Sequence, residues 1–137
     1  MLSISADKID SLFESIASSY NLYIPVDNES GKAEFEQWEK GKKLSSALKT
    51  VRSAKDFFFP KVENLVNYKR EGKSITVVDP RKDLGDFVIF GVRGCDAASF
   101  AIIDDVYLKM DPVDSYYKNR RDHGTVVTLA CTEPAQT

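Results

Sequence analysis

The sequence has no long hydrophobic run and no targeting leader. Residues 1–20 contain no basic stretch followed by an apolar one, which a secretory signal peptide requires. No stretch of the chain approaches the ~20 consecutive apolar residues that a membrane-spanning helix needs. We therefore expect a soluble, cytoplasmic protein without a membrane span.

Cysteine is scarce, and neither sign of charge dominates. The chain has two cysteines, Cys95 and Cys131, which are too few for a disulfide scaffold and do not form a Cys-x-x-Cys pair. The 19 Lys and Arg against 21 Asp and Glu give a net charge of -2. Because proteins that bind a nucleic-acid backbone usually carry a basic excess, this balance disfavours a nucleic-acid partner.

The sequence also lacks the motifs of several self-sufficient enzymes. It contains no GxGxxG dinucleotide motif, no phosphate-binding P-loop, no HExxH zinc motif and no GxSxG nucleophile elbow. We expect no catalysis from this chain alone. Whether it forms part of a larger enzyme is left open by these absences.

What is present describes one ordinary globular domain. The 137 residues lie within the commonest range of domain sizes, and the 42% hydrophobic and 29% charged residues are close to globular averages. We find no internal repeat and no low-complexity segment. Residues 1–137 are therefore expected to form a single domain.

The N-terminal half contains two periodic patterns. Apolar residues recur every three or four positions over 6–19, which predicts an amphipathic helix whose first amides are capped by Ser5 or Asp7. Segments 21–26 and 32–38 carry strand-forming residues on either side of a polar turn, which predicts a β-hairpin.

The middle of the chain mixes loops with an aromatic cluster. Pro25 removes a backbone donor, so its strand is expected at a sheet edge. Segment 39–52 is polar and lysine-rich, which predicts a loop with a short helix. Three phenylalanines occupy 57–59, and we expect at least two to be buried, in the core rather than against a partner. Segments 62–69 and 74–79 predict a second hairpin, with a helix as the alternative for the first of them.

The last third predicts a parallel unit. Two apolar runs, 87–90 and 126–130, are continuous rather than alternating, which is typical of strands covered on both faces by helices. Two helices are predicted between them, so the order is that of a crossover unit. The fold class is therefore α/β (α+β mixed): a mixed sheet with a parallel strand-helix-strand C-terminal half and a more antiparallel N-terminal half.

Local signals set the limits of these two helices. Asp96 is expected to cap a helix that runs to residue 108. Asp111 is expected to cap the second helix, with Pro112 at its first position. Gly124 is expected to end that helix in a left-handed conformation.

The densest chemical signal follows the first apolar run. Ligands in open α/β sheets bind at the carboxyl ends of strands, and Gly91 and Gly94 let the backbone turn and approach a ligand closely. Cys95 stands at the start of a helix, where the dipole favours the thiolate that binds metals. The alternative is that both glycines only shape a turn and that Cys95 packs as a small hydrophobe. Asp96 completes the turn.

The second cysteine strengthens the case for a shared site. Cys131 directly follows the other apolar run, and parallel neighbouring strands bring both thiols to one rim of the sheet, with their sulfurs within roughly 10 Å. Two thiols are not a complete set, because an iron–sulfur cluster is ordinarily held by four cysteines.

Other charged residues have simpler interpretations beside functional ones. Arg93 could support the negative charge of a cofactor, or could form an ion pair with Asp96. His123 is expected to face solvent at a helix end. The basic residues of 118–121 favour the C-terminus of their helix, with docking of an acidic partner as the alternative.

Five segments together resemble a known family. The chain is similar to the N-terminal region of the iron–sulfur electron-transfer subunits found in sulfhydrogenases, where this is the beta subunit, and in anaerobic sulfite reductases. The segments that carry the resemblance are LYIPV at 22–26, FFFPKVENL at 57–65, GVRGCD at 91–96, DPVDSYYKNRR at 111–121 and CTEPAQT at 131–137.

The resemblance implies a role in electron transfer. It implies that 1–137 is a fragment lying upstream of a ferredoxin-like dicluster domain. Cys95 and Cys131 then supply two thiolates to an iron–sulfur cluster of the 4Fe-4S type, completed by a Cys-x-Cys pair that follows this region in the family. It also implies docking to catalytic and flavoprotein subunits of an anaerobic oxidoreductase complex, of the hydrogenase or sulfite reductase type. No cluster is expected on this part of the chain alone.

Around the two cysteines, the expected cofactor-binding residues are Gly91, Arg93, Gly94 and Asp96. One alternative is a cluster-free interaction module with structural cysteines, whose aromatic patch binds another subunit. Another is a small-molecule or nucleotide binder that uses the turn from Gly91 to Asp96 at the sheet edge.

Overall fold

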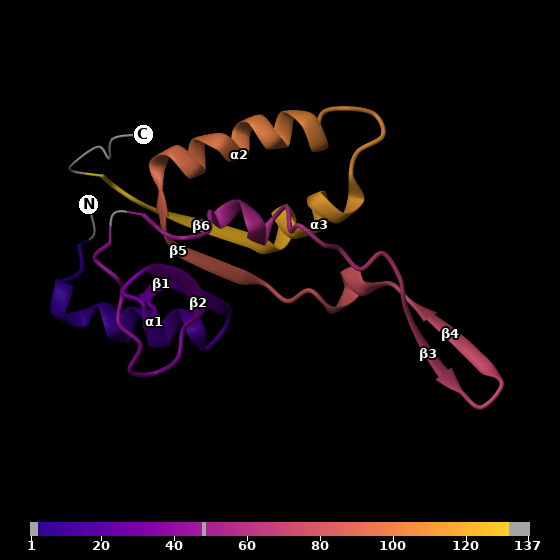
Figure 1. Ribbon diagram of the computed structural model, residues 1–137, viewed down its shortest axis with the longest axis horizontal. Coiled ribbons are helices and arrows are strands. Elements are labelled where there is room, and N and C mark those ends of the chain that lie inside the picture. The colour runs from indigo at the N-terminus through magenta and orange to yellow at the C-terminus, as the bar shows by residue number, and fades with distance from the viewer. Residues whose placement is uncertain (1–2, 48, 132–137) are drawn as a thin grey trace.

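The computed structural model describes residues 3–47 and 49–131. The chain forms a four-stranded mixed sheet and a separate two-stranded sheet, with helices packed against the larger one, as the α/β prediction required (Figure 1). The elements in chain order are η1 (Ala6–Lys8), α1 (Ile9–Ala17), β1 (Asn21–Asp27), β2 (Ala33–Gln37), η2 (Ala54–Phe57), β3 (Asn67–Glu71), β4 (Ser74–Val78), η3 (Pro80–Asp83), β5 (Phe87–Arg93), α2 (Gly94–Tyr107), α3 (Ser115–His123) and β6 (Gly124–Leu129), where η denotes a 3₁₀ helix.

The four-stranded sheet has the order β2-β1-β5-β6. β1 pairs antiparallel with β2, whereas β5 pairs parallel with both β1 and β6. The two parallel strands β5 and β6 are joined through α2 and α3, as predicted. The antiparallel N-terminal half and the parallel C-terminal half therefore meet at the pairing of β1 with β5.

The side chains of β5 alternate between two apolar layers. Val88 packs with Phe13 of α1 on one face of the sheet. Phe87 and Ile89 pack on the other face with a cluster contributed by η2, α2 and α3. Figure 1 shows α1 on one side of the sheet and α2 on the other. β6 was expected to be covered on both faces, but it is an edge strand whose residues are half-buried or exposed.

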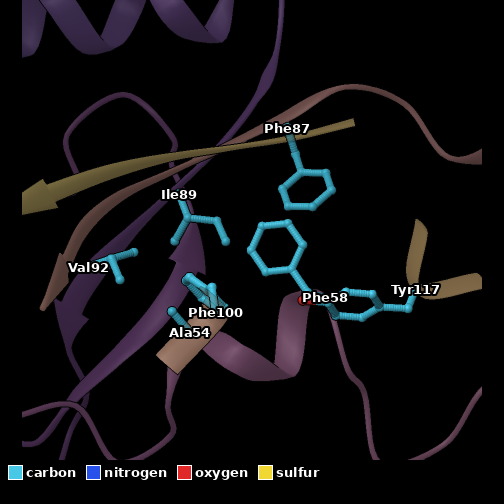
Figure 2. Close-up of a cluster of buried hydrophobic side chains, with 7 residues drawn as sticks. All are labelled: Ala54, Phe58, Phe87, Ile89, Val92, Phe100 and Tyr117. Atoms are coloured by element: carbon cyan, nitrogen blue, oxygen red, sulfur yellow. The ribbon is translucent and has the colours of Figure 1, made fainter. Parts of the chain in front are cut away.

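Phe58 lies at the centre of the larger apolar cluster. Its side chain is 1% exposed, and its ring centroid lies 5.5 Å from that of Phe87 and 5.0 Å from that of Phe100. Figure 2 shows these side chains converging on one another. Phe57 is half-buried against the same cluster, whereas Phe59 is exposed. The prediction that at least two of the three rings are buried in the core is confirmed, so this segment is not an aromatic docking patch.

Pro25 does not lie at a sheet edge, contrary to prediction, because β1 is an interior strand. The parallel pairing with β5 covers only Asn21–Tyr23, so it ends before the proline that lacks a donor. Gly91, at a φ of +85°, lies opposite the proline ring, and a Cβ on it would be 3.1 Å from Pro25 Cδ. A break in the β5–β6 register occurs at the same place, between Phe90 and Val92. A glycine bulge thus makes room for a proline inside the sheet.

The predicted helix caps are mostly wrong. Neither Ser5 nor Asp7 caps a helix amide, and Asp96 lies in the first turn of α2 rather than at its cap. α3 begins at Ser115, and Asp114 rather than Asp111 accepts hydrogen bonds from its first amides. An aspartate has the right chemistry at either position, so the packing of α3 against the sheet decides which one is used.

Two further expectations need correction. No helix lies between residues 39 and 52 among the residues described there; a 3₁₀ helix capped by Ser53 follows instead, at Ala54–Phe57. Gly124 has a φ of -98°, so it is not a left-handed helix stop. A glycine is required there by packing, because a Cβ would come within 2.3 Å of Phe58 Cε1. The second hairpin is present as β3 and β4, with Gly72 at a φ of +61° in its turn.

Candidate functional site at the ends of β5 and β6

The two cysteines follow equivalent positions of neighbouring parallel strands. Arg93 at the end of β5 is the register partner of Leu129 at the end of β6. Cys95 lies two residues beyond Arg93, at the start of α2, and Cys131 lies two residues beyond Leu129. The topology therefore places both at the carboxyl rim of the same pair of strands. The sulfur–sulfur separation of within roughly 10 Å stays a prediction.

Both thiols are free and exposed. Neither packs in the core as a small hydrophobe, so the interpretation of Cys95 as a buried structural cysteine is wrong. Exposed thiols at the end of a sheet are accessible to a metal or to another thiol.

The first turn of α2 presents unpaired backbone donors at this rim. The cap residue, Arg93, makes no side-chain capping bond. The amides of Gly94, Cys95 and Asp96 lie in the first turn, where no intrahelical acceptor exists. The positive end of the helix dipole also lies there, which suits a negatively charged group. Gly94 is exposed and surrounded by open space, whereas Gly91 is buried and its conformation is explained by Pro25.

Arg93 holds a polar atom without a partner. Its Nε is buried, and no described residue accepts a hydrogen bond from it. A guanidinium carries its charge at all physiological pH values, and its buried N–H groups ordinarily have acceptors. The expected alternative, an ion pair with Asp96, is not formed.

Asp96 instead binds a residue that the sequence did not single out. Lys55 Nζ of η2 donates a hydrogen bond to Asp96 Oδ1 at 2.8 Å. This ion pair links η2 to the first turn of α2 and fixes the start of the helix that carries Cys95. Lys55 could not be identified from spacing, because it lies 41 residues away along the chain.

A second polar group lies inside the fold and not at the rim. Arg121 forms two hydrogen bonds to Asp104, at 2.8 and 2.9 Å, and the Tyr117 hydroxyl donates to the same carboxylate at 2.6 Å. Burial raises the pKa of Asp104, but the hydrogen bonds from Arg121 and Tyr117 outweigh it, so the net pKa is lowered. Burial, with the bond to Asp104, raises the pKa of Tyr117. The Arg121 guanidinium also lies 4.9 Å from the centroid of the Phe58 ring, so this group stabilises the core.

The other basic residues of α3 and its end form internal ion pairs. Arg120 binds Glu63, and Lys118 binds Asp122. His123, expected to face solvent, is half-exposed and pairs with a carboxylate at 2.6 Å, that of Asp86. These pairs occupy the cluster that was considered for docking an acidic partner.

Comparison with known proteins identifies one relative. The chain is 35% identical over 83 residues to sulfhydrogenase 2 subunit beta of Pyrococcus furiosus, which is 61% of this chain and 23% of that protein. The similarity supports a relation to the family suggested by the motifs. The aligned stretch spans about a quarter of the length of that relative. No family model and no solved structure matches the chain.

The described residues supply two candidate metal ligands at the rim and no complete set. No group of three or more His, Cys, Asp or Glu side chains among residues 3–47 and 49–131 is arranged to hold a metal ion. Within the same ranges, no helix is long and apolar enough to cross a membrane.

Proposed function

We propose that this chain is a domain of an electron-transfer subunit of a cytoplasmic oxidoreductase complex. In this proposal Cys95 and Cys131 are thiolate ligands of an iron–sulfur cluster. The observation that carries it is the equivalent placement of two free, exposed thiols, each two residues beyond the register pair Arg93 and Leu129. The similarity to a sulfhydrogenase beta subunit supports the same conclusion.

The residues at the rim fit such a group in kind. Thiolates are the ordinary protein ligands of iron–sulfur clusters, and a thiolate-ligated cluster is anionic. The Arg93 Nε has no acceptor among the described residues, and the first amides of α2 have none within the helix. Hydrogen bonds from these donors, together with the charge of Arg93, would favour an anionic cluster at this rim.

The set of thiolates is completed, in this proposal, by cysteines outside the described residues. The relative is about four times longer than the aligned stretch, which leaves room for further ligands and for a ferredoxin-like domain. An iron–sulfur cluster supplies one-electron transfer when bound. The residues of this chain hold the cluster, orient donors toward its sulfurs and set its exposure to solvent, while the catalytic and flavoprotein subunits provide the chemistry on substrate.

The test is anaerobic reconstitution of the full-length protein with iron and sulfide. Wild type is expected to show broad visible absorption, and Cys95→Ser and Cys131→Ser are each expected to lose iron. Ala98→Ser, an exposed position on the same helix, is the matched control and should keep the wild-type iron content. Because both cysteines are exposed, neither serine variant should change the melting temperature of the 137-residue chain appreciably.

Full iron content in both cysteine variants would exclude these residues as ligands. The cluster-free interaction module would then be the better description of the domain.

A further inference from the structure

The segment from Asn67 to Val78 forms an isolated β-ribbon, which we call the arm. Its strands β3 and β4 pair with each other and with no other strand among the described residues. Figure 1 shows the arm projecting away from the four-stranded sheet. A two-stranded ribbon without a hydrophobic cover has marginal stability in water, so an exposed arm of this kind gains most by contact with another surface.

One face of the arm is apolar and exposed. Tyr68 lies opposite Val77, and Arg70 lies opposite Ile75, and since side chains alternate along a strand, these four share one face. The exposed fractions are 74% for Tyr68, 69% for Val77 and 65% for Ile75. In a monomer such a cluster is unfavourable, and it is typical of an interaction surface.

The opposite face of the arm is polar. Lys69 lies opposite Thr76, and Glu71 lies opposite Ser74. The arm is therefore amphipathic with the period of a strand, and this pattern normally buries its apolar face. Here no described residue covers that face.

The base of the arm is held in place by α3. Arg120 binds Glu63 through two hydrogen bonds, of 2.7 and 3.1 Å, just before the arm begins. Tyr116 donates a hydrogen bond to the carbonyl of Leu65. On the other side, Arg81 donates to Ser115 Oγ at 2.7 Å. The two ends of the arm are therefore attached to the same helix, and substitutions on the arm leave the core untouched.

The charges of the arm indicate what kind of surface it fits. The ammonium of Lys69 lies 3.1 Å from the carboxylate of Glu71, so these two charges offset each other. Arg70 and Lys73 have no carboxylate partner among the residues that the structure describes. The arm thus presents an apolar face with two uncompensated positive charges near its turn.

We propose that the arm docks this domain onto another subunit of its complex, by placing its apolar face in an apolar groove edged by carboxylates. The existence of such a complex rests on the proposed function. Apolar contact would supply most of the affinity, and Arg70 and Lys73 would pair with the carboxylates and favour the correct orientation. A second copy of this chain fits the arm less well, because two arms meeting through this face would bring their Arg70 side chains together.

The first test measures the affinity of the purified full-length protein for the remaining subunits of its complex. Ile75→Ser and Val77→Ser are each expected to weaken binding about tenfold or more, as for a buried interface residue. Thr76→Ala, on the polar face of the same strand, is the matched control and should bind like wild type. Increasing salt should weaken wild-type binding, and an Arg70→Gln, Lys73→Gln double variant should show a smaller salt dependence. Equal affinities for Ile75→Ser, Val77→Ser and Thr76→Ala would overturn the proposal.

The second test identifies the occupant. Ile75→benzoylphenylalanine in the assembled complex is irradiated, and the cross-linked peptide is identified by mass spectrometry. A peptide of another subunit from an apolar surface with neighbouring Asp or Glu residues supports the proposal. A peptide from a second copy, or from another part of the same polypeptide, contradicts it.

These outcomes are separable from those of the proposed function. If the reconstituted protein holds iron but the arm variants bind normally, only the docking role fails. If the cysteine variants keep iron while the arm variants release their partner, the docking role stands and the assignment of the ligands fails.

Discussion

Gly124, the first residue of β6, lies in direct contact with the ring of Phe58. A Cβ at this glycine would be 2.3 Å from Phe58 Cε1 and 2.6 Å from the Cζ of Phe87. Both rings are buried in the larger apolar cluster, and neither can move without displacing its neighbours. Gly124→Ala is therefore expected to lower the free energy of unfolding by about 1–3 kcal/mol. Denaturant titration of the 137-residue chain measures this directly.

Gly94→Ala is the matched control for that substitution. Gly94 also has a negative φ, but a Cβ there would meet nothing within 4 Å. Alanine is the better helix former, so this variant should be as stable as wild type or slightly more stable. Equal losses in the two variants would show that the close contact at Gly124 is relieved at no cost.

The carboxylate of Asp104 predicts an acid-sensitive stability. Its hydrogen bonds from Arg121 and Tyr117 outweigh burial and hold its pKa below the ordinary value of 3.8. A carboxyl whose pKa is lowered by folding stabilises the folded state above its unfolded pKa, and this contribution is lost as the pH falls through the folded pKa. Asp104→Asn should therefore reduce the free energy of unfolding at pH 7 by about 1–3 kcal/mol, and the difference from wild type should shrink toward acid pH.

Asp122→Asn provides the comparison at an exposed ion pair. Asp122 binds Lys118 on the surface of α3, where a helical pair contributes at most a few tenths of a kcal/mol, roughly 0.2–0.5. Thermal melts of both variants between neutral and acid pH are the measurement. A pH-independent difference between Asp104→Asn and wild type would mean that ionisation of Asp104 does not stabilise the fold.

The unpartnered Nε of Arg93 leads to a prediction about reduction potential. If this guanidinium faces a cluster ligated by Cys95 and Cys131, its charge favours the reduced and more negative form. Arg93→Gln in the reconstituted full-length protein is then expected to shift the reduction potential to a more negative value. Arg70→Gln, on the arm, is the control and should leave the potential unchanged. A redox titration followed by electron paramagnetic resonance decides between them, and an unchanged potential in Arg93→Gln would assign that residue a purely structural role.

Local sequence patterns were enough to predict the strands of both sheet halves. The continuous apolar run at 87–90 predicted a strand covered on both faces, and β5 has this environment. The hairpin turns were also found, because polar and glycine-rich turns act over a few residues. The placement of Cys95 after one strand and Cys131 after its neighbour followed from the same patterns.

The features that the sequence did not predict depend on contacts between distant residues. Pro25 suggested an edge strand because the glycine bulge that accommodates it lies at Gly91, in another strand. Asp96 looked like a helix cap, since Lys55 cannot be identified as its partner from sequence. Gly124 looked like a left-handed stop, although the packing of Phe58 requires it. Each of these residues was recognised as special, but the reason lay in tertiary structure.

The arm has a further consequence for how proteins with this fold can diverge. Asn67 and Val78 are cross-strand neighbours, so the chain leaves the domain and returns to it at adjacent points. Insertions and exchanges are best tolerated at such exposed, closely spaced ends. The intervening residues can therefore be shortened, lengthened or replaced as a cassette while the rim with Cys95 and Cys131 keeps its geometry. Recognition at the tip and chemistry at the sheet edge are in this sense free to evolve at different rates.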